Sequence, residues 1–227
     1  MKFALALLAL VATVSAGKIE LPNFGRGQLH NDIQDFIDLI DTDKVINIFL
    51  QYVAEDAEVK DAIAFLESDE FKGLVVNVEH MSEVKTLMDY IHHAGIDIYQ
   101  IVNLLNDFLK LGHLTPPDFT QRVHKQLTGG VRGLVDDILA VLPKDELNDL
   151  YEKKLKSSPE FAKFVDQLKS DNFQQIVNKV YANPTFQKLL KRADEAGIDL
   201  ELIKNLLKVL WGIDVPPRPS RFHVRRF

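Results

Sequence analysis

The chain has 227 residues, a formal net charge of −6 and no cysteine. The absence of cysteine excludes disulfide-framework folds such as the saposin-like and insect odorant-binding proteins, and it excludes thiol catalysis and Cys-containing zinc sites. The acidic balance makes nucleic acid a poor partner, because affinity for nucleic acid comes largely from neutralising phosphates.

The amino terminus, MKFALALLALVATVSA, has the pattern of a secretory signal peptide. Lys2 precedes an apolar run from Phe3 to Val11, and small residues end the segment at Ala16. The alternative is a membrane anchor, but the uncharged stretch is shorter than the ~20 residues that span a bilayer. We therefore predict a signal peptide over residues 1–16, a mature chain that starts at Gly17 and is soluble and secreted, and an N-terminal extension over residues 17–27.

One phrase occurs twice in the chain. "AGIDIYQIVNLLNDFLKLG" begins at Ala94 and "AGIDLELIKNLLKVLWG" begins at Ala196, an offset of 102 residues. The same offset aligns "FLESDEFKGLVVNV" with "QLKSDNFQQIVNKV", and no gap is needed between Asp35 and about Leu111. An internal repeat of this length predicts a fold built from two similar units.

The residues at the boundaries of the repeated segments are typical of the ends of short α-helices. Ser68 and Ser170 precede apolar runs as N-caps do. The prolines of "SPEF" and "NPTF" suit a first helical position. Gly95 and Gly197 suit a left-handed turn before caps at Asp97 and Asp199. We predict an all-α fold of two tandem repeats with about six helices each: repeat 1 over residues 28–115, a linker over 116–129 and repeat 2 over 130–215.

Several of the predicted helices have unusually wide apolar faces. In the helix from Asp97 the apolar positions cover roughly 180°, against the ~100° stripe of an ordinary surface helix. Such a helix is either a central element of a solid bundle or part of a shell around an apolar lumen. Periodicity alone does not choose between these two interpretations.

The sequence offers little catalytic chemistry. It has no G-x-S-x-G elbow and no H-E-x-x-H, and His92 and His93 are adjacent, so they cannot share a metal as an i, i+4 pair would. A calcium loop from Asp41 fails at its sixth and twelfth positions, Ile46 and Tyr52, so Asp41 is interpreted as a cap. The carboxylates are expected mainly on solvated faces or at caps. We expect no enzyme activity, no metal and no cofactor.

The chain ends in a basic segment, residues 216–227, with three prolines and four arginines. One interpretation is a solvated, disordered tail. The other is docking to an anionic surface such as a membrane or a glycan, through Arg218, Arg221, Arg225 and Arg226.

Three groups of residues together resemble a known family. They are the "DDIL…LP…L" opening from Asp136 to Leu147, the "PEF" and "SDNF" helix starts, and the "AGID" turn at Ala196. Over about residues 28 to 215 the chain resembles the insect-allergen-related repeat family, which includes cockroach gut allergens, mosquito midgut microvillar proteins and nitrile-specifier proteins of white butterflies. Repeat 1 has the same features more loosely, with "DTD" at Asp41 in place of Leu-Pro.

The resemblance implies one hollow helical shell, made by the two repeats, around a large apolar cavity that carries fatty acids or phospholipids. It also implies a secreted midgut protein of the gut lumen or microvillar surface. We expect a non-enzymatic lipid-binding protein. The alternatives are a nitrile-specifier-like detoxification factor that acts on glucosinolate breakdown, and a membrane-disrupting protein that exchanges lipid.

The candidate lipid-binding residues are the apolar positions on which both repeats agree. Each is expected in the cavity wall or in the core between helices. The pairs are Phe49 with Tyr151, Val53 with Leu155, Leu66 with Leu168, Phe71 with Phe173, Val75 with Val177, Leu87 with Leu189, Ile101 with Ile203, Leu105 with Leu207, and Phe108 with Leu210.

Overall fold

The computed structural model describes residues 20–23, 25, 27–110 and 127–217. These ranges contain twelve α-helices and no β-strand, so the predicted all-α class is confirmed. The signal peptide, linker residues 116–126 and tail residues 218–227 lie outside the described residues. The helices are α2 (Gln28–Leu39), α3 (Thr42–Glu55), α4 (Ala57–Leu66), α5 (Asp69–Glu79), α6 (Ser82–His93), α7 (Ile98–Lys110), α8 (Gly130–Leu139), α9 (Lys144–Ser157), α10 (Pro159–Leu168), α11 (Asp171–Tyr181), α12 (Pro184–Glu195) and α13 (Leu200–Trp211).

The helix boundaries recur along the chain at the offset of the sequence repeat. Helices α3, α4, α5 and α6 begin and end 102 residues before α9, α10, α11 and α12, as with Thr42–Glu55 and Lys144–Ser157. Helices α2 and α8 begin 102 residues apart, and so do α7 and α13. Each helix of the first half therefore has a counterpart in the second half.

The predicted helix caps are formed. The hydroxyl oxygens of Ser68 and Ser170 accept hydrogen bonds from backbone N–H groups three residues later, at 3.2 and 3.3 Å. Asp97 and Asp199 do the same at 3.0 and 2.8 Å, and Asp41 caps α3 as expected. These bonds satisfy N–H groups that the first helical turn leaves without a partner.

The two AGID turns have the predicted left-handed glycines, but the surroundings differ. Gly95 has φ +98° and Gly197 has φ +79°. A Cβ on Gly95 would lie 2.2 Å from the backbone nitrogen of Gly27, whereas a Cβ on Gly197 would meet only the Arg132 side chain, at 3.4 Å. The first turn therefore needs glycine both for its φ and for a close backbone contact with the segment before α2.

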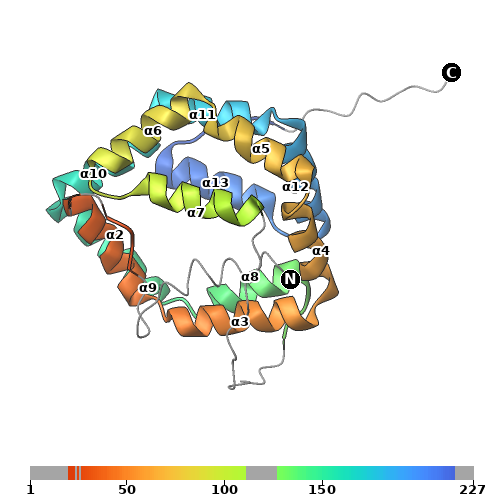
Figure 1. Ribbon diagram of the computed structural model, residues 1–227. Coiled ribbons are helices and arrows are strands. Elements are labelled where there is room, and N and C mark those ends of the chain that lie inside the picture. Colours follow the sequence, from red (N-terminus) through yellow and green to blue (C-terminus); the bar gives the residue numbers. More distant parts are fainter. Residues whose placement is uncertain (1–19, 24, 26, 111–126, 218–227) are drawn as a thin grey trace.

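In the view of Figure 1 the helices α2 to α6 and α8 to α12 form a ring, and α7 and α13 lie within its outline. Around this ring, helices of one half lie beside helices of the other half. Helix α2 packs against α9 and α10, and its counterpart α8 packs against α3 and α4. In the same way, α6 packs against α11 and α5 packs against α12. Contacts of corresponding helices thus join the two halves into one body.

The described part of the chain has two buried clusters, and each lies where the halves meet. The first contains Ile48, Tyr52 and Val59 of α3 and α4, with residues of α8 packed against them. The second contains Leu29 of α2 with Phe161 and Val165 of α10. The Phe161 ring lies between those of Phe36 and Tyr151, with centroid distances of 5.4 and 5.8 Å. The two clusters therefore lie at two junctions of the ring, and the apolar residues that are buried outside them are Phe65, Leu74, Ile176, Tyr181 and Ile213.

Residues before α2 are tied to the first AGID turn. Asn23 forms an isolated antiparallel bridge with Ile96, and the backbone N–H of Asp97 donates to the carbonyl of Pro22 at 3.1 Å. A ring nitrogen of His30 lies 2.7 Å from the Leu21 carbonyl oxygen. The described end of the N-terminal extension is consequently part of the folded body.

Candidate functional site

The candidate lipid-binding residues fall into groups with different environments. Val53 is buried in the first cluster and Phe49 packs against it, while Ile101, Tyr151 and Leu155 pack against the second cluster. These five positions contribute to packing between helices. The partly buried candidates outside the two clusters are Leu66, Phe71, Val75, Leu87, Leu168, Phe173, Val177, Leu189 and Leu207.

Of the remaining four candidates, one is exposed and three have side chains that the structure does not describe. Ile203 is 43% exposed, so it is not a core residue, although its counterpart Ile101 packs against the second cluster. At Leu105, Phe108 and Leu210 the structure describes the backbone alone, so their predicted role lies outside the described side chains.

Three helices of the ring have an apolar face but bury no residue. Helices α6, α9 and α12 each span three or more turns, and none of their residues is buried. Their apolar side chains, such as Leu87 and Leu189, are only partly covered. An amphipathic helix in a solid bundle buries its apolar stripe against its neighbours. Ile91 of α6 and Tyr151 and Leu155 of α9 pack against the second cluster, yet no side chain of the three helices is buried by the described residues.

Exposed apolar side chains are concentrated on one helix. Of the eight large apolar residues that are exposed in the described part of the chain, four belong to α13, and the most exposed is Val209 at 81%. The four are Leu202, Ile203, Leu206 and Val209. The other four are Leu39, Val76, Val135 and Leu139.

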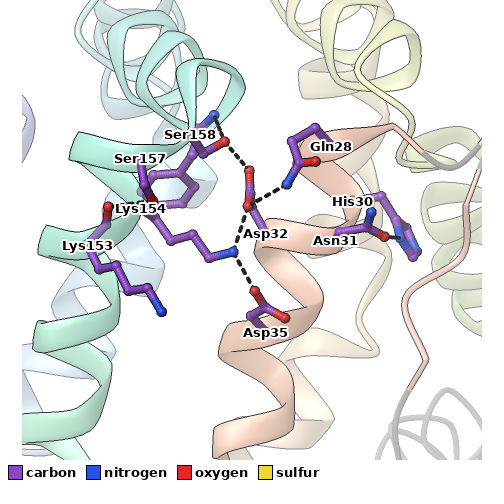
Figure 2. A network of polar contacts seen from close by, with 10 residues as sticks. Gln28, His30, Asn31, Asp32, Asp35, Lys153, Lys154, Ser157 and Ser158 are labelled. Atoms are coloured by element: carbon purple, nitrogen blue, oxygen red, sulfur yellow. Dashed lines mark hydrogen bonds and ion pairs between the residues drawn. The ribbon is translucent and has the colours of Figure 1, made fainter.

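A polar network joins the halves beside the second cluster (Figure 2). Asp32 of α2 is fully buried and accepts hydrogen bonds from Lys154 at 2.7 Å, Ser158 at 2.5 Å and Gln28 at 3.1 Å. The Lys154 ammonium also contacts Asp35, so it lies between two carboxylates of α2. Ser158 in turn caps α10. The network therefore fixes α2 against the α9–α10 corner.

The charges in this network stabilise each other. Burial alone would raise the pKa of Asp32, but hydrogen bonds from Lys154, Ser158 and Gln28 outweigh it and hold the pKa below its usual value. Burial alone would lower the pKa of Lys154, and the two carboxylates reverse this and raise it. Both groups are therefore ionised at neutral pH. The network is a paired, hydrogen-bonded structural contact.

A related network lies at the other junction. The Tyr52 hydroxyl donates to Asp137 of α8 at 2.7 Å and accepts from the Gly129 N–H at 3.1 Å. Thr128 also donates to Asp137 through its hydroxyl, at 2.9 Å. Burial, followed by the hydrogen bond to Asp137, raises the pKa of Tyr52, so the phenol stays protonated at neutral pH. This second network fixes α8 against α3.

The two networks occupy corresponding places in the repeat. Asp35 and Asp137 are 102 residues apart, and so are Tyr52 and Lys154. Each junction thus pairs an aspartate of the first helix in one half with a residue of the second helix in the other half. The carboxylates were expected mainly on solvated faces or at caps, and Asp32 and Asp137 are exceptions because both are buried. Asp35 and Asp137 align in the two repeats, which is a sign of a shared role. Their partners Lys154 and Tyr52 also align, but a lysine and a tyrosine have too little chemistry in common to predict a conserved contact from the sequence.

Neither a metal-binding cluster nor a membrane-spanning helix occurs in the described residues. They contain no group of three or more His, Asp or Glu side chains placed to hold a metal ion. In the same part of the chain, no helix combines the length and apolar character needed to cross a bilayer.

Comparisons with known proteins place the chain in a family. A mosquito protein, Protein G12 of Anopheles gambiae, is 28% identical over 184 residues, which cover 81% of this chain and 87% of the relative. The family model described as "Insect allergen related repeat, nitrile-specifier detoxification" matches residues 28–204, from the start of α2 into α13. The match covers well over half of the chain and supports the resemblance drawn from the repeated helix starts and turns. The chain belongs to the insect-allergen-related repeat family.

Proposed function

We propose that this protein is a non-enzymatic lipid-binding protein that holds the acyl chains of fatty acids or phospholipids against apolar helix faces. The observation that carries the proposal is the position of the core. Nine of the buried apolar residues lie in two clusters at the junctions between the halves, while α6, α9 and α12 have no buried residue. Protein interiors normally pack at a density of about 0.75, as solid as organic crystals. Several helices have apolar faces that the protein covers incompletely. This arrangement favours an apolar ligand that packs against those faces.

The energetics of such binding need no specific polar group. An acyl chain of about 16 carbons that is fully buried gains roughly 12 kcal/mol before the costs of association, at ~0.8 kcal/mol per methylene. Affinity should therefore follow the apolar area of the ligand more than its head group.

The proposed setting is the gut. The signal-peptide pattern of residues 1–16 supports secretion, and the resemblance to midgut family members supports the gut lumen or the microvillar surface. Nucleic acid is not a proposed partner, because the chain is acidic.

The proposal is tested by displacement of a fluorescent fatty acid from delipidated protein, with competitors of increasing chain length. We expect saturable binding and a regular gain in affinity with each added methylene, by at most about fourfold per group. A methyl ester should compete about as well as its parent acid. Absence of saturable binding, or affinity that ignores chain length, would contradict the proposal.

The same preparation separates the proposal from detoxification. A glucosinolate with its hydrolase is incubated with and without the protein, and the products are analysed. We expect the product distribution to be unchanged. Redirection of the product to a nitrile, by protein that fails the fatty-acid assay, would favour a nitrile-specifier function.

A further inference from the structure

Helix α13 has one apolar side that the described residues leave uncovered. This side, called here the α13 apolar face, is made of Leu202, Ile203, Leu206 and Val209. At 3.6 residues per turn these four positions lie within about 120° of one another around the helix axis. Their side chains are 54%, 43%, 48% and 81% exposed. No other helix in the described part of the chain exposes more than two large apolar residues.

The charged side chains of α13 lie on its other side. Glu201, Lys204 and Lys208 are spaced i, i+3 and i+7, and their common direction is roughly 180° from the α13 apolar face. The side chains of Glu201 and Lys208 are 72% and 56% exposed, and both lysines pair with nearby carboxylates. Charged side chains of this kind face the surrounding water. The α13 apolar face therefore points away from the outer surface.

The two ends of α13 are attached to different parts of the ring. Before the helix begins, the Gly197 carbonyl accepts a hydrogen bond of 2.8 Å from Arg132 of α8, which packs on the first cluster. At its other end, Trp211 packs against the second cluster. The backbone of Asp214 also exchanges two hydrogen bonds, of 2.9 and 2.8 Å, with Gln174 of α11. The helix thus crosses the ring (Figure 1), with its charged side toward water and its apolar face toward the ring interior.

The corresponding helix of the first half does not have such a face. At an offset of 102 residues, Leu202 corresponds to Gln100 and Val209 corresponds to Asp107 in α7. Ile101, the counterpart of Ile203, packs against the second cluster. An apolar residue at positions 202 and 209 is thus not required by the fold of a repeat, and the additional apolar area belongs to the second half alone.

We propose that the α13 apolar face is the main contact surface for the bound acyl chain, so that the chain lies along α13 rather than along α7. The inference rests on the proposed function and adds which helix holds the lipid. The occupant of this face is apolar, because a polar one would leave four apolar side chains without favourable contacts. It is also narrow enough to lie between the ring and a helix that is attached to it at both ends. An acyl chain satisfies both conditions.

The absence of cysteine from the chain allows a direct test. A Val209→Cys variant has a single thiol, and its rate of labelling by a water-soluble maleimide is measured in delipidated protein with and without palmitic acid. The matched control is Val76→Cys on α5. Val76 is also an exposed valine, but it shares the charged side of its helix with Asp69 and Lys72, at i−7 and i−4.

We expect saturating palmitic acid to slow the labelling of Val209→Cys at least about tenfold, because a thiol reacts only where the reagent reaches it. The labelling of Val76→Cys should change by less than about twofold, since no bound chain covers that position.

Affinity gives a second measurement. In the fatty-acid displacement assay, Leu202→Gln with Val209→Asp, which introduces the residues of α7, should weaken the binding of palmitic acid roughly tenfold or more, because two apolar contacts are lost and a carboxylate is added. Val76→Asn, which introduces the residue of its counterpart Asn178, should stay within about twofold of the wild type. Far-UV circular dichroism checks that each variant keeps its helices.

Unchanged labelling of Val209→Cys in protein that binds palmitic acid would overturn the inference while the proposed function stands, and so would wild-type affinity of the double variant. Equal protection of both cysteine variants would overturn it as well, because the covering would not be specific to α13. The same holds if Val209→Cys is protected without lipid in a dimer seen by analytical ultracentrifugation, since a second copy would then cover the face. Absence of saturable binding by the wild type would contradict the proposed function and the inference together.

Discussion

Replacing Lys154 by methionine tests how the two halves are held together. The substitution keeps most of the apolar stem and removes the ammonium that lies between Asp32 and Asp35. Asp32 is fully buried, so it would remain as a charge with only Ser158 and Gln28 as donors. Loss of one partner of a buried ion pair costs about 3–5 kcal/mol. Because two hydrogen bonds remain, we expect about 3 kcal/mol of lost unfolding free energy at neutral pH.

The sign of the pH dependence follows from the lowered pKa of Asp32. A carboxyl group whose folded pKa is depressed contributes stability above its unfolded pKa of about 3.9, and this stability is lost as the pH falls through the folded pKa. Without Lys154, the burial of Asp32 acts against fewer opposing contacts, so the variant should protonate Asp32 more easily. The cost of Lys154→Met should therefore shrink as the pH is lowered from 7 toward 3.

Urea unfolding, followed by far-UV circular dichroism and by the fluorescence of the single tryptophan, measures this cost. Trp211 packs against the second cluster, so its emission reports on the same junction. The matched control is Lys156→Met on the same helix. The Lys156 side chain is exposed and pairs only with Glu152, so its replacement should cost less than about 0.5 kcal/mol. A cost for Lys154→Met as small as the control, or one that does not change with pH, would refute the role given to the network.

Three further predictions concern other parts of the molecule. Gly95→Ala should destabilise the protein by about 3 kcal/mol or more, because it combines a positive φ with a backbone clash. Gly197→Ala should cost only about 1–2 kcal/mol, because its Cβ would meet no backbone. Equal losses of stability in thermal unfolding would contradict this difference. Tyr52→Phe should cost about 1–3 kcal/mol in urea unfolding, since it removes a donor and an acceptor at the buried junction, and Tyr151→Phe serves as the comparison. Intact-mass analysis of the secreted protein should show a chain that starts at Gly17, and a retained Met1 would disprove the proposed cleavage.

The local features of the fold were predictable from the sequence because they depend on residues close together in the chain. Ser68 and Ser170 predict helix starts because the hydroxyl oxygen of a capping serine accepts a hydrogen bond from a backbone N–H only three residues later. Gly95 and Gly197 predict left-handed turns because other residues rarely adopt a positive φ. These signals set the helix boundaries in both halves.

The pairing of the halves was not predictable in the same way. The repeat in the sequence does not say which helices contact each other, and in the structure α2 and α8 each pack on helices of the opposite half. Asp32 has no counterpart that suggests burial, since the residue 102 positions later is Leu134. Its environment is created by Lys154 and Ser158, more than 120 residues away. Such contacts follow from tertiary packing and leave no local pattern.

The wide apolar faces correctly predicted amphipathic helices. They did not predict which apolar side chains the protein itself buries. Ile101 and Ile203 agree in the two repeats, but the first packs against a core cluster and the second is exposed. Hydrophobic periodicity identifies the face that avoids water. It does not identify whether a side chain, a lipid or a membrane covers that face, so the candidate wall residues remain predictions.

The most direct test of the lipid-binding account is to purify the protein natively from its own tissue and identify what it carries. Organic-solvent extraction followed by mass spectrometry gives the identity of bound lipids and their molar ratio to protein. The account predicts fatty acids or phospholipids in at least equimolar amount, lost on delipidation and restored by incubation with acyl lipids. Folded native protein that yields no stoichiometric lipid, and that takes none up on incubation, would contradict it.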